Sequence, residues 1–184
     1  MDAFEQIVAE CLEQKGYWVK QNYKVRLTPQ EKQRIGLPTR PRWELDIIAY
    51  KPGRQELLFV ECKSLLDSRG VKYSAVAGND SRRTNRYKLF NNRKWRRLVL
   101  KKAKSQLVSE GAVTADCEPT LCLAAGKITS KKDRVELKAH FAKQGWLFFD
   151  PDWVREALEA AGGSGYENSV SVMVAKLLLR AKCK

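Results

Sequence analysis

The sequence has a single histidine, His140, and no Cys-x-x-Cys pair. Zinc sites are usually built from such pairs or from several histidines, so zinc-dependent activities are not expected. A catalytic triad of the Ser-His-Asp or Cys-His type would have to use His140, and no residue near it supports that role. The chain also lacks the Gly-x-x-x-x-Gly-Lys-Ser/Thr sequence of phosphate-binding loops, which argues against ATP-driven work.

Long apolar runs, internal repeats and low-complexity tracts are absent as well. No segment is apolar enough over a sufficient length to span a bilayer, and the first residues lack the basic end and apolar stretch of a signal peptide. The five cysteines are odd in number and scattered, unlike a disulfide framework. Cys11, Cys62 and Cys122 lie in apolar runs and are expected to be small core residues. We therefore expect a cytoplasmic protein without a membrane partner.

Basic residues dominate the charge of the chain. It has 35 Lys and Arg against 21 Asp and Glu, a formal net charge of +14. Such an excess attracts polyanions and favours a nucleic-acid partner. Between Ser81 and Ser109 there is no acidic residue, and the basic residues there are Arg82, Arg83, Arg86, Lys88, Arg93, Lys94, Arg96, Arg97, Lys101, Lys102 and Lys104.

We refer to residues 81–109 as the basic segment and expect it to contact the phosphate backbone of DNA, together with Arg40 and Arg42. A solvated charged face is the alternative. Tyr87, Phe90 and Trp95 are interleaved with the basic residues and either stack on bases or anchor the segment in the core. An anionic membrane surface is a weaker partner, because no long amphipathic basic helix stands out in the first half of the segment.

Charged residues interrupt two apolar runs, residues 43–50 and 57–63, which read as strands. The turn signal Pro52-Gly53 between them predicts a hairpin that places Asp46 opposite Glu61, within about one residue of register. Side chains alternate along a strand, so Glu61 and Lys63 share one face and Cys62 points to the other.

Two carboxylates in these positions repel each other. At a separation of about 4 Å and an effective dielectric constant near 20, the repulsion is about 4 kcal/mol. Such a pair shares a proton, binds a cation or moves apart. A divalent cation with oxygen ligands, beside the ammonium of Lys63, resolves the conflict and predicts a metal-dependent active site. The alternative is a surface hairpin with solvated charges, against which the apolar flanking residues argue.

The arrangement of Asp46, Glu61, Cys62 and Lys63 on two adjacent apolar strands after an amphipathic helix resembles the PD-(D/E)XK nuclease superfamily, which includes restriction endonucleases and Holliday-junction resolvases. The resemblance implies that Asp46 and Glu61 hold Mg²⁺, with Mn²⁺ as a substitute, and that the Cys62 carbonyl is a further ligand. It implies that Lys63 positions the attacking water or stabilises charge on the phosphate. No proline precedes Asp46, and the segment after Lys63 matches nothing in the pattern.

Three further residues are candidates for accessory roles. In the first helix, Glu5 lies beside Leu12 at the edge of the apolar stripe. Glu5 either reaches the metal, or is a first-turn acidic residue that the helix dipole stabilises and that has no other role. Glu44 shares a strand face with Asp46 and either supports the metal ligands or pairs with an arginine. Gln106 resembles the polar residue that a helix after the Lys motif presents to the active site in such nucleases, and an ordinary exposed glutamine is the alternative.

Hydrophobic periodicity and turn signals predict an α/β fold. We expect a restriction-endonuclease-like core with a mixed central β-sheet flanked by helices, and extra C-terminal helices. One nuclease-like domain covers residues 1–184, with the core at 1–128 and a helical and strand extension at 129–184. Residues 65–92 are expected to form a long substrate-engaging loop with a short strand near 71–76, or to be disordered. The last helix packs on a partner or covers the sheet.

The function that follows is a Mg²⁺-dependent DNA endonuclease acting on double-stranded or branched DNA, as a homodimer if both strands of a duplex are cut. The alternative is a non-catalytic DNA- or RNA-binding module with the same fold. A basic structural protein of a ribonucleoprotein particle is a third interpretation, which leaves the buried charges unexplained.

Overall fold

The computed structural model describes residues 2–36, 43–80, 82–163 and 169–182. Its centre is a five-stranded sheet in the order β1-β2-β3-β4-β5. The neighbours β1–β2 and β2–β3 are antiparallel, whereas β3–β4 and β4–β5 are parallel. The strands are β1 (Trp18–Val25), β2 (Trp43–Lys51), β3 (Glu56–Lys63), β4 (Pro119–Ala125) and β5 (Leu147–Phe149).

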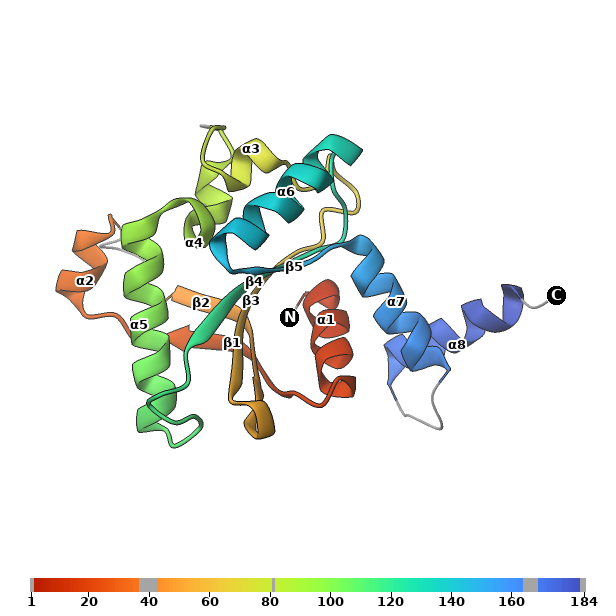
Figure 1. Cartoon of the computed structure of the whole chain (residues 1–184), viewed down its shortest axis with the longest axis horizontal. Coiled ribbons are helices and arrows are strands. Elements are labelled where there is room, and N and C mark those ends of the chain that lie inside the picture. Colours follow the sequence, from red (N-terminus) through yellow and green to blue (C-terminus); the bar gives the residue numbers. More distant parts are fainter. Residues whose placement is uncertain (1, 37–42, 81, 164–168, 183–184) are drawn as a thin grey trace.

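Helices flank this sheet on both sides and continue beyond it at the C-terminal end (Figure 1). The longer helices are α1 (Ala3–Gln14), α5 (Arg93–Ser109), α6 (Lys131–Gln144), α7 (Pro151–Gly162) and α8 (Val170–Lys182). The shorter ones are α2 (Pro29–Arg34), α3 (Tyr73–Val76) and α4 (Lys88–Asn91), with single 3₁₀ turns at η1 (Pro52–Arg54) and η2 (Thr84–Tyr87). The prediction of an α/β fold with a mixed sheet and C-terminal helices is confirmed.

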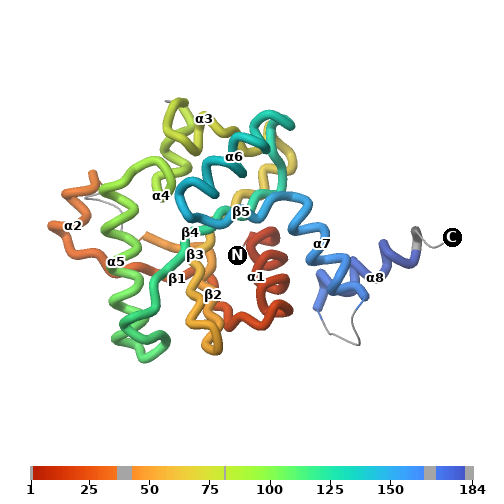
Figure 2. Tube along the Cα trace, viewed as in Figure 1, coloured from red at the N-terminus to blue at the C-terminus, as the bar shows by residue number. Residues whose placement is uncertain are grey.

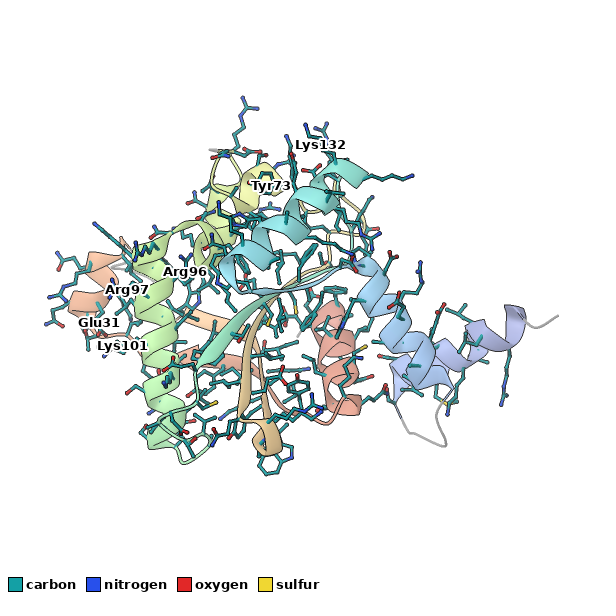
Figure 3. The ribbon with its side chains drawn as sticks, viewed as in Figure 1. Glu31, Tyr73, Arg96, Arg97, Lys101 and Lys132 are labelled. Atoms are coloured by element: carbon teal, nitrogen blue, oxygen red, sulfur yellow. The ribbon has the colours of Figure 1, made fainter. Side chains whose placement is uncertain are left out.

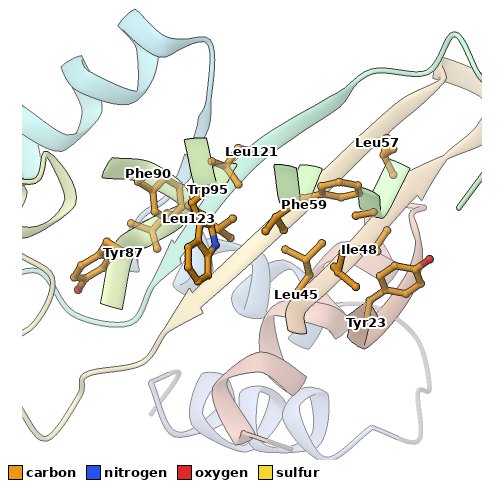
Figure 4. Close-up of a cluster of buried hydrophobic side chains, with 14 of the residues drawn as sticks. Tyr23, Leu45, Ile48, Leu57, Phe59, Tyr87, Phe90, Trp95, Leu121 and Leu123 are labelled. Atoms are coloured by element: carbon orange, nitrogen blue, oxygen red, sulfur yellow. The ribbon is translucent and has the colours of Figure 1, made fainter. Parts of the chain in front are cut away.

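The two faces of the sheet bury separate sets of apolar side chains. On one face α5 contributes Trp95, Val99, Ala103 and Leu107, which pack on residues such as Phe59 and Leu123 (Figure 4). On the other face α1 contributes Phe4, Val8 and Leu12, which pack on β2 and β3. The tube in Figure 2 shows α5 and α1 on opposite sides of the strands. Residues 131–149 belong to the same sheet and core, through β5 and through Leu137 and Phe141 of α6.

Helix ends are fixed by local capping residues. Asn92 accepts a hydrogen bond from Trp95 N at the start of α5, and Gly145 adopts the left-handed conformation that ends α6. Asp150 caps α7, whose first residue is Pro151. The carboxylate of Asp150 is 4% exposed and also accepts hydrogen bonds from Arg134 and Lys138.

Replacement of Asp150 is expected to destabilise the fold in a pH-dependent way. Burial raises its pKa, but hydrogen bonds from Lys138, Trp153 N and Arg134 outweigh burial and lower the pKa below its usual value. A lowered folded pKa gives stability that is complete above the unfolded pKa near 4 and is lost as the pH falls through the folded value. Asp150→Asn should therefore cost about 1.5–3 kcal/mol at pH 7, and Asp150→Ala about 1 kcal/mol more through the lost cap.

Urea unfolding of both variants and of the wild type at pH 7 and at pH 3 measures this. The wild-type advantage over Asp150→Asn should shrink at pH 3. An advantage that is the same at both pH values would contradict the assignment.

The segment 65–92 differs from the prediction. A short strand near 71–76 is wrong, because only Val71 forms a β-bridge, with Ile128, and the chain then enters α3. Gly70 permits the bridge: its φ is +85°, and a Cβ there would lie 2.9 Å from Lys127 O. Asp133 accepts a hydrogen bond from Tyr73 N at 2.9 Å, which satisfies the first backbone N–H of α3. The segment is a helical insertion whose apolar residues Val76, Tyr87, Leu89 and Phe90 are buried in the core.

The last helix does not cover the sheet. Helix α8 packs on α7 and extends away from the sheet at the right of Figure 1. Several of its apolar side chains remain exposed, namely Val170, Met173, Val174, Leu177 and Leu178. Among the helices that the structure describes, none has the length and apolarity required to cross a membrane.

Candidate active site

The β2–β3 hairpin brings the predicted acidic residues together. The ladder between β2 and β3 ends at the pair Ile47–Val60; Asp46 immediately precedes Ile47, and Glu61 immediately follows Val60. The charge of Asp46 raises the pKa of Glu61, so the two carboxylates are within electrostatic reach of each other. Asp46 Oδ2 accepts a hydrogen bond from Cys62 N at 2.7 Å, which fixes its side chain against β3. Leu57 and Phe59 face the α5 side of the sheet and Leu58, Val60 and Cys62 the α1 side. The alternation therefore continues with Glu61 and Lys63 on the α5 side, as predicted.

Lys63 forms an ion pair with Glu61 at the end of β3. Lys63 Nζ lies 2.6 Å from Glu61 Oε1 and donates a second hydrogen bond to Cys62 O at 3.0 Å. Both side chains are largely buried, with 19% and 12% of their surfaces exposed. The second carboxylate oxygen, Glu61 Oε2, is buried and has no hydrogen-bond partner among the residues that the structure describes. A buried carboxylate oxygen without a partner is costly, so this atom marks a position where a cation or a proton is favoured.

The carboxylates at this site resist ionisation. Burial raises the pKa of Glu61 to about 7, helped by Asp46 and Glu5 and opposed by Lys63. Burial also raises the pKa of Asp46, against the lowering effects of Lys63 and the Cys62 N–H. The pKa of Lys63 is lowered by burial but raised more by Glu61 and Asp46, so Lys63 stays charged at neutral pH. The arrangement is a like-charged pair held by one internal cation, which is the electrostatic conflict expected from the sequence.

Glu5 approaches this group from the first turn of α1. Asp2 caps the helix by accepting a hydrogen bond from Phe4 N at 2.8 Å, and Glu5 follows on the half-buried side. Burial raises the pKa of Glu5, and the charges of Asp46 and Asp2 raise it further. Glu5 is therefore within electrostatic reach of Asp46, so the structure places it at the same end of the sheet as the hairpin residues.

The basic segment is divided between two places. Arg82, Arg83 and Arg86 surround η2, next to the buried ring of Tyr87. The pKa of Tyr87 is raised by burial, against the lowering effects of the charges of Lys63, Arg86 and Arg83, so this part of the segment is within electrostatic reach of Lys63. Arg93, Lys94 and Arg97 are exposed on α5, and Figure 3 shows Arg97 on the outer side of that helix.

Arg96 and Lys88, two of the residues predicted to bind DNA, make contacts within the protein. Arg96 Nη1 donates hydrogen bonds to the carbonyls of Leu89 and Phe90, and its guanidinium lies 4.7 Å from the ring centre of Trp146. The Lys88 ammonium lies 4.7 Å from the ring centre of Trp95. The three interleaved aromatic residues, Tyr87, Phe90 and Trp95, are buried and so anchor the segment in the core.

Gln106 does not face the active site. Its side chain accepts a hydrogen bond from Arg26 N at 2.6 Å and donates to Lys24 O at 3.3 Å, so it ties α5 to the end of β1. Glu44 is exposed but close enough to raise the pKa of Asp46. No ion pair of Glu44 occurs within the described ranges. Arg40 and Arg42 lie outside the described residues.

One residue near the site, Arg69, was not singled out from the sequence; it lines the same cavity as Arg83, from the turn after β3. Tyr87 was singled out as a stacking or core residue, but its electrostatic proximity to Lys63 was not predicted. The turn Ser68-Arg69-Gly70 has no sequence signal for a binding role. Arg69 comes close to Arg83 only because the segment 65–92 folds back on itself.

The groups predicted to hold a divalent cation are the carboxylates of Asp46 and Glu61 and the carbonyl of Cys62, which the β2–β3 hairpin brings to one region. In the part of the chain that the structure describes, no three side chains of His, Cys, Asp or Glu gather in a metal-binding group. Two carboxylates and one backbone carbonyl are therefore the protein ligands on offer, which suits Mg²⁺ because it usually keeps several waters. Burial and the nearby carboxylates raise the pKa of the Cys62 thiol well above its usual value. Its side chain packs in the cluster on the α1 side of the sheet, away from the side that Glu61 faces.

No protein-family model, no curated protein and no solved structure matches this chain.

Proposed function

We propose that the protein is a Mg²⁺-dependent DNA endonuclease of the PD-(D/E)XK type, with a restriction-endonuclease-like core. The observation that carries the proposal is the group at the ends of β2 and β3: Asp46 beside Glu61, with the ammonium of Lys63 on Glu61 Oε1. The three residues have the order and spacing of the motif, on the strands where the motif is expected. The net charge of +14 supports a polyanionic substrate.

The unpartnered oxygen Glu61 Oε2 supports a cation at this position. Asp46 and Glu61 would hold Mg²⁺ with the Cys62 carbonyl, and Mn²⁺ would substitute. When bound, the ion would supply Lewis-acid stabilisation of a phosphoryl oxygen and a lower pKa for a bound water.

Lys63 would act on the substrate directly. Its pKa is raised by Glu61 and Asp46, so it carries a positive charge at neutral pH and does not act as a base. An ammonium held by the ion pair to Glu61 would orient the attacking water and stabilise the negative charge that builds up on the phosphate. Glu5, within electrostatic reach of Asp46, would add negative charge that strengthens the affinity for the cation.

A non-catalytic DNA- or RNA-binding module is the second candidate. Lys63 Nζ contacts Glu61 Oε1 and Cys62 O, two of the oxygens offered to the metal. A protein in which that internal cation permanently replaces the metal would bind nucleic acid without cutting it.

An assay of cleavage separates the two candidates. Purified protein is incubated with supercoiled plasmid, single-stranded DNA, branched DNA and single-stranded RNA, each in Mg²⁺ and in EDTA. The nuclease proposal requires cleavage of DNA in Mg²⁺ and none in EDTA. Binding of every substrate without cleavage would support the binding module instead.

Metal binding itself is expected to stabilise the fold. Mg²⁺ at about a hundred times its Kd should raise the free energy of unfolding by about 2.7 kcal/mol, because it binds the folded state only. Glu61→Gln should lose this gain, whereas Glu13→Gln, at the exposed end of α1, should keep it. Denaturant unfolding with and without Mg²⁺ measures the effect. An equal gain in wild type and Glu61→Gln would place the ion elsewhere.

A further inference from the structure

A cavity of about 450 Å³ lies beside the candidate active site and is lined by four arginines. Arg69 comes from the turn after β3, and Arg82, Arg83 and Arg86 come from the segment around η2. Ser68 and Tyr87 complete its polar lining. None of the ion pairs in the described parts of the chain involves these arginines. Four cations around one concavity repel one another, so the cavity favours an anion of high charge.

The wall that carries Arg69 is fixed to the body of the protein. Val71 N donates a hydrogen bond to Lys127 O at 2.8 Å, and Lys127 Nζ donates to Leu66 O at 3.1 Å. Gly70 lies against the backbone of residues 127–128, where a Cβ would not fit. The turn before it is closed by the hydrogen bond from Ser68 N to Leu65 O. Arg69 is therefore presented from an anchored turn.

The opposite wall is anchored as well. Asp80 accepts hydrogen bonds from Arg82 N through its side chain and from Arg83 N through its backbone carbonyl. Asn91 Nδ2 donates to Thr84 O at 2.9 Å, and the ring of Tyr87 is buried in the core with 3% of its surface exposed. The backbone positions of both walls are thus set before a ligand arrives, which lowers the entropy cost of binding.

The chemistry of this cavity fits a phosphate monoester. Guanidinium groups form paired, charge-assisted hydrogen bonds with phosphate oxygens. A terminal phosphate presents three free oxygens and a charge of about −1.5 to −2 at pH 7, whereas an internal phosphodiester has a single charge and a chain leaving on both sides. The four arginines around this open concavity therefore match the higher charge and the three free oxygens of a strand end better than the single charge of an internal phosphodiester.

Tyr87 connects the cavity with the candidate active site. It lines the cavity, and Figure 4 shows it at the end of the core cluster opposite to Tyr23. The charges of Lys63 and Glu61 on one side and of Arg83 and Arg86 on the other all act on it. Leu65, two residues after Lys63, also lines the cavity, so a phosphate held by the arginines would lie at the end of β3 that carries Lys63.

We propose that this arginine cavity binds the terminal phosphate of a DNA strand, so that the protein acts on phosphorylated ends, nicks or flaps beside the Asp46–Glu61–Lys63 site. The cleavage position in this statement rests on the proposed nuclease function, but the binding of the end does not require cleavage.

Equilibrium binding of defined DNA ends tests the proposal. A short duplex with an internal fluorescent base is prepared with a 5′-phosphate, with a 3′-phosphate or with hydroxyls at both ends, and its affinity is measured by anisotropy in EDTA. One of the phosphorylated duplexes should bind about tenfold more tightly than the hydroxyl duplex, the gain expected from charge-assisted hydrogen bonds to one phosphate.

Variants from the two walls locate the effect. The combined change Arg83→Ala and Arg86→Ala, and separately Arg69→Ala, should reduce the ratio of the two affinities to about one. Arg97→Ala, on the outer side of α5 (Figure 3), should leave the ratio unchanged while lowering both affinities together. Melting temperatures confirm that each variant is folded.

Equal affinity for all three ends, or a ratio that survives in both cavity variants, would overturn the assignment. Because binding is measured in EDTA, that outcome is distinct from an absence of cleavage in Mg²⁺, which would contradict only the proposed nuclease function.

Discussion

Asp46→Asn is expected to abolish DNA cleavage while leaving the protein folded. The asparagine keeps an oxygen that accepts the hydrogen bond from Cys62 N, but it removes the negative charge that would hold the metal. Metal-bound charge contributes several kcal/mol to the transition state, so the cleavage rate should fall by at least about a thousandfold. Single-turnover cleavage of a labelled DNA duplex in Mg²⁺ measures the loss.

The matched control is Asp116→Asn. Asp116 is exposed in the loop before β4, whose first residue pairs with Leu57 near the turn of the hairpin, at the end of the sheet opposite Asp46. Its replacement makes the same change in charge and should alter the rate by less than about twofold, as is usual for exposed substitutions. If Asp46→Asn cuts as fast as Asp116→Asn, the assignment of Asp46 is wrong.

Lys63→Met should lower the cleavage rate by about a hundredfold to a thousandfold, the usual effect of removing one group that stabilises developing charge. Methionine keeps most of the side-chain length and removes the ammonium that contacts Glu61 Oε1 and Cys62 O. The affinity for DNA should change far less than the rate, because a single phosphate contact is lost among many. Cleavage rate and Kd are measured on the same duplex.

Lys132→Met provides the comparison for Lys63. Lys132 projects from the start of α6, at the top of Figure 3, and is exposed. It should leave the cleavage rate almost unchanged. A loss of rate in Lys63→Met that is matched by an equal loss of DNA affinity would make Lys63 a binding residue only.

Local signals predicted most of the fold. The Asp150-Pro151 pair fixes the start of α7, and Gly145 fixes the end of α6, because caps depend on neighbouring residues alone. The Pro52-Gly53 turn set the register that brings Asp46 to Glu61, since a hairpin of fixed length has little freedom. The candidate site depends on this register.

Contacts between distant segments could not be predicted in the same way. The insertion after β3 has turn-forming residues throughout, yet it folds because Val71 bridges to Ile128 and Asp133 caps α3. The distribution of charge along the sequence does not show which basic side chains are free to bind a ligand. Arg96, for example, donates hydrogen bonds to the carbonyls of Leu89 and Phe90. Gln106 lies at a helical position that suited the active site, but its side chain forms hydrogen bonds with the end of β1 instead.

The central claim is that Asp46, Glu61 and Lys63 form one metal-dependent site that cuts DNA. The most direct test is the rate of nicking of a supercoiled plasmid by the wild-type protein as Mg²⁺ is titrated from zero in EDTA-treated buffer. The rate should be undetectable without Mg²⁺, should rise to a plateau, and should return to zero when EDTA is added. Plasmid that is bound but remains supercoiled at every Mg²⁺ and Mn²⁺ concentration would contradict the claim.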